Sequence, residues 1–196
     1  PVGVIGYDNF GTVFNSLLAE QNISHHGIIL DDTRPTTAKT RVIADSQHIV
    51  RIDKESKETI GQNIQNKIFD YVKSIIKNID GIILQDYNKG VSSSLISQII
   101  ELANKNKILV TVDPKFNNFY EYKNVTVFKP NRKEAEDILG MKIKTDADIS
   151  FAGSTLLKKL NAKNILLTLG EGGIAVFEKG KPEKRMPTKA RKVADV

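Results

Sequence analysis

The chain has 196 residues, a formal net charge of +6 and no cysteine, which fits one domain with a buried core and excludes disulfides and thiolate metal sites. The charge could indicate a nucleic-acid partner, but the lysines are scattered among carboxylates, and no basic run with interleaved aromatic residues occurs. No apolar run approaches the roughly 18 residues that a membrane-spanning helix needs, so we expect a soluble cytoplasmic protein that binds small anions rather than nucleic acid or membrane.

The first part of the chain predicts a strand and helix unit followed by an antiparallel hairpin. Val2–Ile5 reads as a buried strand, Asn9–Gln21 carries apolar residues at helical spacing, and His26–Leu30 could be a second strand. The stretch TTAKTRVIADSQHIVRIDKE then alternates polar and apolar residues, which is typical of an antiparallel pair with one solvent-exposed face. We expect residues 33–55 to form lid or dimer strands.

The rest of the chain alternates predicted helices and strands. The predicted helices are Ile60–Ile76, Leu95–Ala103, one that starts after Asn131, and Ala152–Leu160. The predicted strands are Gly81–Leu84, Ile108–Val112, Val125–Phe128 and Ile165–Leu169, and a further hairpin begins within Gly172–Phe177. This alternation predicts a doubly wound, mostly parallel α/β sheet with helices on both faces, and we assign all of 1–196 to that one domain.

Polar loops follow four of these strands: QDYNKG, DPKFNN, KPNRKE and TLGEGG. Ligands of open α/β sheets bind at the carboxyl ends of the strands, so four such loops favour a polyanion or sugar site. Phosphoryl transfer is a chemistry that they could support, because it needs charge neutralisation and positioning more than covalent groups. Lys89 and Lys115 could contact phosphate oxygens. Three glycines of the last loop would let the backbone approach a nucleotide: Gly170, Gly172 and Gly173.

The segment KPNRKEAE has two interpretations. In one, Asn131 caps a solvated helix and Glu134 is its reciprocal partner three residues on. In the other, the segment is a ligand site in which Glu134 holds magnesium directly or through water. Taken singly, each lysine could be a solvated side chain and each glycine an ordinary turn. No Walker sequence or kinase-type glycine loop occurs, so phosphoryl transfer would require another architecture.

Over nearly all of its length the sequence resembles the ribokinase-like (PfkB-type) carbohydrate kinases, and within them the bacterial kinases of heptose 7-phosphate. The resemblance is carried by VGVIGYDNFG, RPTTAKTRVIA, HIVRIDKE, QDYNKG, VDPK, KPNRKEAE, LLTLGEGG and VADV. Of these, RPTTAKTRVIA, DYNKG and PNRKEAE are specific to the heptose branch. The resemblance implies an ATP- and magnesium-dependent kinase that phosphorylates the anomeric hydroxyl of heptose 7-phosphate for lipopolysaccharide synthesis.

The resemblance also implies roles for single residues on the nucleotide side. Asn131 and Glu134 would organise magnesium and the nucleotide phosphates. The segment from Thr168 to Gly173 would lie along the nucleotide.

On the sugar side, the resemblance implies that Lys89 and Lys115 face the sugar phosphate or the transferred group. Arg41 and Arg51 look like lid residues that could close over the sugar, although either could equally be an exposed strand charge.

The family pattern extends past both ends of the sequence. A strand with a sugar-binding aspartate would precede Pro1. Asp195 matches the start of the signature D-x-T-G-A-G-D, whose last aspartate is the general base, so the base is expected just beyond Val196. We therefore assign the activity to a longer parent protein and expect this segment alone to be inactive.

Three further expectations stay open. The sugar could be a hexose or a ribose instead of a heptose phosphate. The segment could also be a noncatalytic domain that binds a nucleotide or a sugar. Because an antiparallel insert with an open edge needs a cover, we expect a homodimer through the lid strands.

Overall fold

The computed structural model describes residues 1–45 and 47–188, which fall into two compact units. One unit contains Pro1–Lys77 and Lys89–Leu95, and the other contains Asn78–Asn88 and the chain from Ile96 onward. We call them the hairpin unit and the sheet unit. Within the described residues, no helix is both long and apolar enough to cross a membrane.

The hairpin unit begins with two parallel strands, β1 (Val2–Ile5) and β2 (Gly27–Leu30), that are connected by helix α1 (Asn9–Glu20). Asp8 caps α1, because its Oδ1 accepts a hydrogen bond of 3.0 Å from the amide of Gly11. Helix α2 (Gln62–Ile75) contacts both strands and continues into the 3-10 turn Ile76–Asn78. One face of α2 forms the core of this unit with the buried residues Ile64, Ile68 and Val72.

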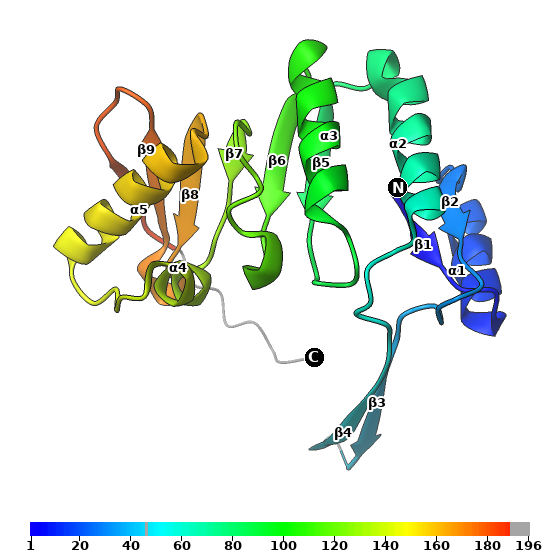
Figure 1. The fold of residues 1–196 in the computed structure, drawn as a ribbon. Coiled ribbons are helices and arrows are strands. Elements are labelled where there is room, and N and C mark those ends of the chain that lie inside the picture. Colours follow the sequence, from blue (N-terminus) through cyan, green and yellow to red (C-terminus); the bar gives the residue numbers. More distant parts are fainter. Residues whose placement is uncertain (46, 189–196) are drawn as a thin grey trace. The chain divides into compact units, whose positions relative to one another are not determined.

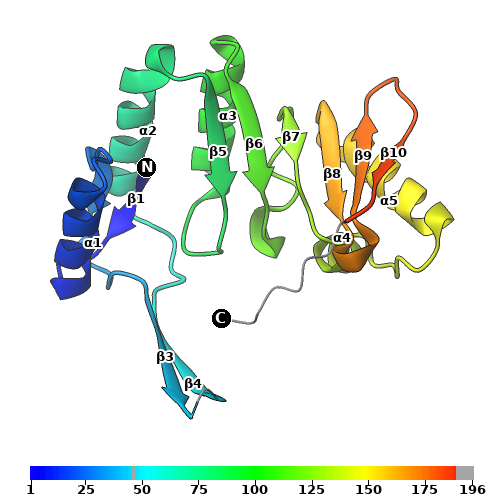
Figure 2. The ribbon, with the colours of Figure 1, turned by 180° about the vertical axis from the view of Figure 1, so that it is seen from behind.

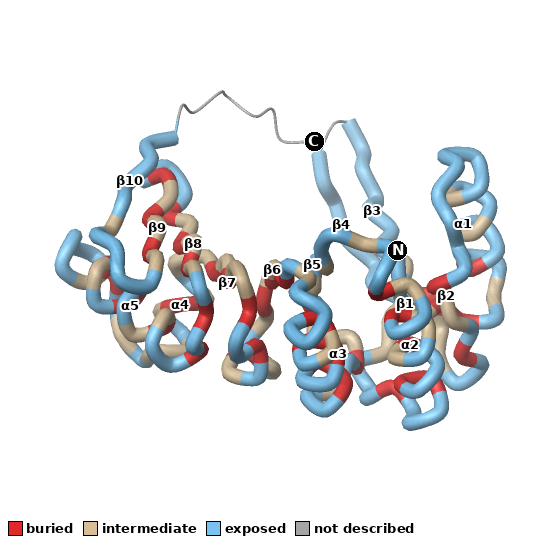
Figure 3. The backbone as a smooth tube through the Cα atoms, turned by 90° about the horizontal axis from the view of Figure 1, so that it is seen from above, coloured by how far each residue is buried: buried red, intermediate tan, exposed pale blue. Residues whose placement is uncertain are grey.

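Between β2 and α2 lies the predicted hairpin, formed by β3 (Ala38–Ala44) and β4 (Gln47–Lys54). The strands pair antiparallel, with a bulge beside Val42 and Ile43, which confirms the antiparallel insert. Almost every residue of the hairpin is exposed, as Figure 3 shows by its pale blue colour. Its side chains therefore find their partners in the opposite strand rather than in a core.

The sheet unit is built on one six-stranded sheet in the order β10-β9-β8-β7-β6-β5. The strands are β5 (Gly81–Gln85), β6 (Leu109–Asp113), β7 (Val127–Phe128), β8 (Asn164–Thr168), β9 (Ile174–Glu178) and β10 (Lys184–Met186). Neighbours from β5 to β8 are parallel, whereas β9 and β10 join antiparallel. The predicted α/β fold with a mostly parallel sheet is confirmed.

Three helices connect these strands: α3 (Ser93–Lys105), α4 (Arg132–Leu139) and α5 (Asp146–Leu160). The views from the front and from behind show that α3 and α5 lie on the same face of the sheet (Figures 1 and 2). Each parallel connection steps one strand in the same direction, and right-handed crossovers then place their helices on one side. Within the described residues, this arrangement differs from the expected helices on both faces of the sheet.

The core of the sheet unit lies between that face and its helices. Val110, Val112 and Phe128 are buried there, whereas Ile83 and Leu109, on the opposite face, are 78% and 54% exposed. This alternation is the period-2 signature of a sheet that is covered on one side.

Most element boundaries shift by one or two residues from the sequence prediction, and the differences at β7 and α5 have a clear description. Only Val127 and Phe128 of the expected strand Val125–Phe128 are in β7. Helix α5 starts well before Ala152, because Thr145 and Asp148 form a capping box that extends the helix through a polar first turn.

Candidate functional site

The charged segment after β7 is a capped helix start. The Asn131 side chain accepts a hydrogen bond of 2.8 Å from the amide of Glu134, and Glu134 Oε2 accepts one of 2.9 Å from the amide of Asn131. This reciprocal pair is a complete capping box, and Gly140 ends α4 in the left-handed region. The capping interpretation of the sequence is therefore confirmed. The amides of the first turn also give this end of the helix a partial positive charge that favours anions.

The second oxygen of the Glu134 carboxylate contacts Lys115, from the loop after β6. Lys115 Nζ lies 2.6 Å from Glu134 Oε1, and this hydrogen bond holds the pKa of the Lys115 ammonium above its ordinary value. The neighbouring Asp113 is paired with Lys129 at 3.0 Å. The carboxyl ends of β6 and β7 thus bring together a lysine and a glutamate that are far apart in the sequence.

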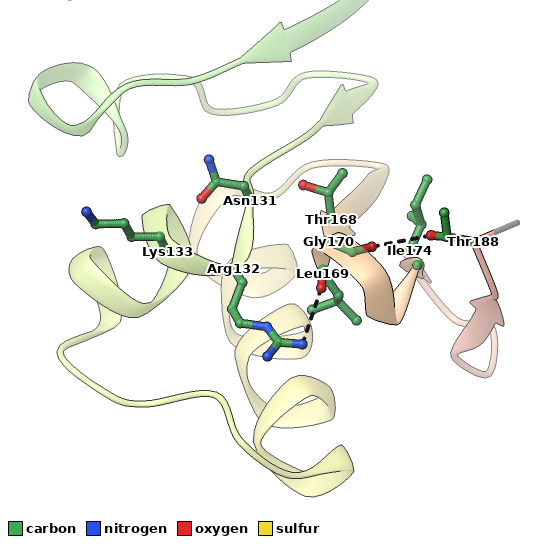
Figure 4. A pocket seen from close by; sticks show the side chains of 9 residues that line it. Asn131, Arg132, Lys133, Thr168, Leu169, Gly170, Ile174 and Thr188 are labelled. Atoms are coloured by element: carbon green, nitrogen blue, oxygen red, sulfur yellow. Dashed lines mark hydrogen bonds between the residues drawn. The ribbon is translucent and has the colours of Figure 1, made fainter. Parts of the chain in front are cut away.

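A pocket of about 500 Å³ opens between the start of α4 and the end of β8 (Figure 4). It is lined by Asn131, Arg132, Lys133, Thr168, Leu169, Gly170, Gly173, Ile174 and Thr188. The backbone fixes its two sides against each other, because the amide of Thr168 donates to the carbonyl of Pro130 at 3.0 Å. Four predicted nucleotide residues therefore line one pocket, whereas Glu134 and Gly172 are not among its lining residues.

The three glycines of the loop after β8 serve different purposes. Gly170 has a φ of +64° and open space where a side chain would point, so the backbone there is accessible from the pocket. Gly173 has a φ of +81°, and a Cβ would lie 2.1 Å from the carbonyl oxygen of Met186. Close approach of β10 therefore requires glycine at position 173, whereas Gly172 forms part of the 3-10 turn Gly170–Gly172.

The sequence prediction does not include four residues of the pocket: Arg132, Lys133, Ile174 and Thr188. Arg132 donates from Nη2 to the carbonyl of Leu169 at 3.4 Å and turns away from Lys133, as Figure 4 shows. Thr188 donates from Oγ1 to the carbonyl of Gly170 at 3.3 Å. Arg132 and Lys133 adjoin Asn131 in the charged segment, so the sequence carried a signal for them. Nothing in the local sequence marks Thr188.

The hairpin unit holds a second group of charges, which we call the hairpin cluster: Lys39, Arg51, Asp53, Glu55 and Lys89. Lys39 Nζ lies 2.7 Å from Asp53 and 3.2 Å from Glu55, and Arg51 lies 2.8 Å from Asp53. Lys89 is ion-paired with Glu55. The hydrogen bonds from Lys39 and Arg51 lower the pKa of Asp53 to about 2. Two predicted substrate residues, Lys89 and Arg51, are therefore joined in one network.

Arg41 lies on the same hairpin, directly across the ladder from Arg51. Like charges that face each other across strands are unfavourable unless an anion compensates them. Among the described residues, the Arg41 side chain forms neither an ion pair nor a hydrogen bond. Its guanidinium is therefore available to a ligand.

Asp8 is a further residue that the sequence prediction missed. Besides capping α1, its Oδ2 accepts a hydrogen bond of 3.1 Å from the amide of Thr36 and lies 3.7 Å from Lys54 Nζ. Hydrogen bonds, chiefly with Thr36, lower the pKa of Asp8 to about 2. The carboxylate thus connects the two ends of the hairpin.

A comparison with protein families matches residues 2–196 to the model described as pfkB family carbohydrate kinase. The chain belongs to this family of carbohydrate kinases. Its relatives include the bifunctional protein HldE of Helicobacter pylori strain J99, which is 41% identical over 195 residues, 99% of this chain and 42% of that protein. The bifunctional protein HldE of Geobacter sulfurreducens is 38% identical over 194 residues, 98% of this chain and 40% of that protein. The chain therefore spans less than half the length of these relatives.

Solved structures of pfkB-like kinases share the fold. The tetrameric inhibited form of phosphofructokinase-2 from Escherichia coli matches with a TM-score of 0.71 and 20% identity, over 96% of this chain and 62% of that one. Ribokinase from Arabidopsis thaliana, solved with ribose and ATP, matches with a TM-score of 0.70 and 18% identity, over 98% and 62%. At these identities the likeness establishes the fold alone.

Membership of this kinase family implies that a magnesium ion takes part in the reaction. The residues near α4 offer few ligands for such an ion. Magnesium takes few protein ligands beside substrate phosphates and keeps several waters. Glu134 supplies one carboxylate, but its oxygens contact the amide of Asn131 and the ammonium of Lys115. The described residues contain no cluster of three or more acidic or histidine side chains that could hold a metal. Glu134 is therefore the side chain that would hold such an ion, together with the phosphates of a bound nucleotide.

Two expectations about the family signature lie outside the described residues. Asp195 belongs to residues 189–196, and the general base is expected beyond Val196.

Proposed function

We propose that the chain is the kinase part of an enzyme that transfers the γ-phosphoryl group of ATP to the anomeric hydroxyl of heptose 7-phosphate for lipopolysaccharide precursor synthesis. The observation that carries this proposal is the pocket between α4 and β8, where a capped helix start faces a glycine turn. The substrate class rests on that pocket together with the family membership and the hairpin cluster. Because the reaction consumes ATP, we place it in the cytoplasm.

The pocket suits a nucleotide for physical reasons. The backbone at Gly170 is open, so a flat base or ribose can approach it without meeting a side chain. The amide-rich start of α4 favours the phosphates. Lys115 and Lys133 add positive charge near that end of the helix, and Lys115 stays protonated at neutral pH because its pKa is raised.

The reaction itself requires little covalent chemistry from the protein. The acceptor oxygen forms a bond to the γ-phosphorus, the bond between that phosphorus and the β,γ-bridging oxygen breaks, and the hydroxyl proton passes to a base. A bound magnesium ion would neutralise charge on the phosphates. The described residues contribute binding and orientation: Asn131 and Thr168 shape the pocket, and Lys115 carries a cation toward the transferred group.

The sugar side of the proposal rests on the hairpin cluster. A substrate that already carries a phosphate needs cations beyond those that contact the nucleotide. Lys89, Arg41 and Arg51 lie in the hairpin unit, and we assign them to the sugar phosphate. The pairing of Lys89 with Glu55 holds the ammonium in place until a phosphate replaces the carboxylate.

The direct test measures ADP release by the full-length protein that contains this sequence. With ATP, magnesium and heptose 7-phosphate we expect turnover, and with ribose, fructose 6-phosphate or heptose without its phosphate we expect at least about tenfold lower kcat/KM. If kcat/KM with fructose 6-phosphate or ribose equalled or exceeded that with heptose 7-phosphate, the proposed substrate would be wrong. No turnover with any of these sugars would contradict the kinase proposal.

A matched pair of cap variants tests the nucleotide pocket. Asn131→Ala and Thr145→Ala each remove a side chain that completes a capping box, so each should destabilise its helix by about 1 kcal/mol. Only Asn131 lines the pocket, so Asn131→Ala alone should raise the Kd for ATP by about tenfold or more. Calorimetric titration of the full-length protein measures both affinities, and equal Kd values for the two variants would exclude this site.

We also propose that the enzyme is a homodimer through the hairpin. On one face of the β3 and β4 ladder the paired residues Val42 and Val50 are 41% and 46% exposed, and Ile52 is 58% exposed. A second copy of the same face would remove this apolar surface from water. Val50→Lys should convert the dimer to a monomer in sedimentation equilibrium, and an unchanged mass would contradict the proposed interface.

A further inference from the structure

Arg34 lies at the base of the hairpin and joins three segments of the hairpin unit. Its Nη1 donates to the carbonyl of Lys89 at 3.0 Å, and its Nη2 donates to the carbonyl of Glu58 at 2.5 Å. Its Nε lies 3.4 Å from the carboxylate of Asp31, and the two side chains are only 9% and 4% exposed. A nearly buried guanidinium thus holds the segment before the hairpin, the segment after it and the loop that carries Lys89.

The position of Gly90 shows how closely these segments approach one another. Gly90 has a φ of +97°, and a Cβ there would lie 2.1 Å from the carbonyl oxygen of Glu58 and 3.0 Å from Arg34 Nη2. The carbonyl of Gly90 also accepts a hydrogen bond of 2.9 Å from the amide of Ile60. Any larger residue at position 90 would push the Lys89 loop away from Arg34.

The Lys89 side chain is held from its other end as well. Its ammonium is ion-paired with Glu55, which in turn pairs with Lys39 on β3. Backbone and side chain of Lys89 are therefore tied to the base of the hairpin by separate contacts, one through Arg34 and one through Glu55. A lysine side chain has four rotatable bonds and loses considerable entropy when it is fixed, so a loop that is already anchored lowers the cost of using it.

We propose that Arg34 is a positioning residue that fixes the backbone of Lys89, so that the Lys89 ammonium meets the phosphate that the sugar substrate already carries. This inference rests on the proposed function, because it takes Lys89 to contact that phosphate. It assigns specificity for a phosphorylated sugar to a residue that does not itself touch the substrate.

The geometry explains why the position requires arginine. A guanidinium can donate to two carbonyls and face a carboxylate at the same time, because its donors form a rigid fork. A lysine keeps the charge beside Asp31 but cannot bridge the carbonyls of Lys89 and Glu58. Arg34→Lys therefore removes the bridge while it preserves the charge of this buried site.

The test uses the full-length protein and compares kcat/KM for heptose 7-phosphate with kcat/KM for the same sugar without its phosphate. We expect Lys89→Met to lower this ratio by about tenfold, the value of one charge-assisted hydrogen bond. Arg34→Lys should lower the ratio in the same direction and leave the KM for ATP unchanged. In the double variant Arg34→Lys/Lys89→Met the ratio should fall no further than in Lys89→Met alone.

Gly90→Ala is a second way to displace the Lys89 loop from its position beside Arg34. Gly180→Ala is the control for this variant. Gly180 also has a positive φ, of +77°, but its Cβ position is open, so the control carries the backbone strain without the clash. Gly90→Ala should lower the ratio as Arg34→Lys does, and Gly180→Ala should leave it unchanged.

Several results would overturn the proposal. An equal loss with both sugars, at an unchanged ratio, would assign Arg34 to folding only. A further fall of the ratio in the double variant would mean that Arg34 acts independently of Lys89. Failure of the proposed function gives a different result, because the unmodified protein would then show no turnover with heptose 7-phosphate.

Discussion

The pocket between α4 and β8 and the hairpin cluster are held together by different forces. The pocket lies at the ends of β7 and β8, and the strand residues Phe128 and Leu167 are fully buried. Its walls are backbone segments that are fixed by amide hydrogen bonds and capping. In the hairpin cluster, Lys39, Arg51 and Asp53 lie on exposed strands, where ion pairs between side chains supply most of the contacts.

This difference predicts how each region responds to its surroundings. Close-packed cores resist change, so the pocket should keep its shape across salt and pH until the sheet unfolds. Exposed ion pairs are weak and screened by salt, so the pairs of Asp53 with Lys39 and Arg51 should rearrange easily when a phosphate enters. A rigid pocket would suit the nucleotide, which all kinases share. An adaptable cluster would suit the sugar, which differs from one kinase to another.

The largest expected effect comes from the core under the pocket. Phe128 is fully buried and packs edge-to-face on Phe119 at 4.8 Å between ring centroids. Phe128→Ala should destabilise the protein by about 3 to 5 kcal/mol, because it removes a large side chain and leaves a cavity. Urea unfolding followed by circular dichroism measures this change. Thr40→Ala on the exposed hairpin should cost no more than about 0.5 kcal/mol. If both variants lost a similar free energy of unfolding, the proposed difference between the buried core and the exposed hairpin would be wrong.

An intermediate effect is expected at a buried carboxylate in the sheet unit. Asp86 is 4% exposed, and its Oδ2 accepts hydrogen bonds from Tyr122 Oη at 2.7 Å and Asn118 Nδ2 at 3.2 Å. Burial and this hydrogen bond raise the pKa of the Tyr122 hydroxyl, so it remains a donor at all physiological pH values. Tyr122→Phe should cost roughly 1.5 to 3 kcal/mol, since a hydrogen bond to a charged group is lost.

Tyr120→Phe is the matched control for that prediction. The half-buried Tyr120 hydroxyl donates to the carbonyl of Ile138 at 3.2 Å and accepts from the exposed Lys159 ammonium at 3.4 Å. Because the contact with Lys159 is long and exposed, loss of the hydroxyl should cost only about 0.5 to 1.5 kcal/mol. Chemical denaturation of both variants gives the comparison. If Tyr120→Phe were the more damaging of the two, the buried carboxylate would not organise the loops after β5 and β6.

The smallest expected effect is the loss of the ion pairs of the hairpin cluster at low pH. The folded pKa of Asp53 is about 2, below its ordinary value of 3.8, because Lys39 and Arg51 donate hydrogen bonds to the carboxylate. The stabilisation by these pairs is therefore complete above about pH 4 and is lost as the pH falls through about 2. A carbon-detected NMR titration of the Asp53 carboxyl should show a midpoint near 2, with hairpin amide shifts that follow it. A midpoint near 3.8 would mean that the cluster does not form in solution.

Much of the fold followed from local signals. The alternation of polar and apolar residues located the hairpin, and apolar residues at helical spacing located α1 and α2. The spacing of Asn131 and Glu134 predicted the capping box that the structure contains. The same spacing occurs at Thr145 and Asp148, where it marks the start of α5 ahead of the predicted Ala152.

Parts of the site could not be predicted because they depend on contacts between distant segments. Lys115 was expected near phosphate, but nothing in the sequence indicates that its ammonium would contact Glu134. Thr188 reaches the pocket only because β10 returns beside β9. The roles of the predicted substrate residues stay predictions, since their phosphate contacts remain to be tested.

The sequence by itself determined the order and type of the elements, the capped start of α4 and the family to which the chain belongs. These properties depend on local periodicity, on capping over a few residues and on shared motifs. Only the tertiary structure decided which charges meet, such as Arg34 with the carbonyls of Lys89 and Glu58. A long charged side chain has many possible partners in the sequence, and the packing of the backbone selects the few within its reach.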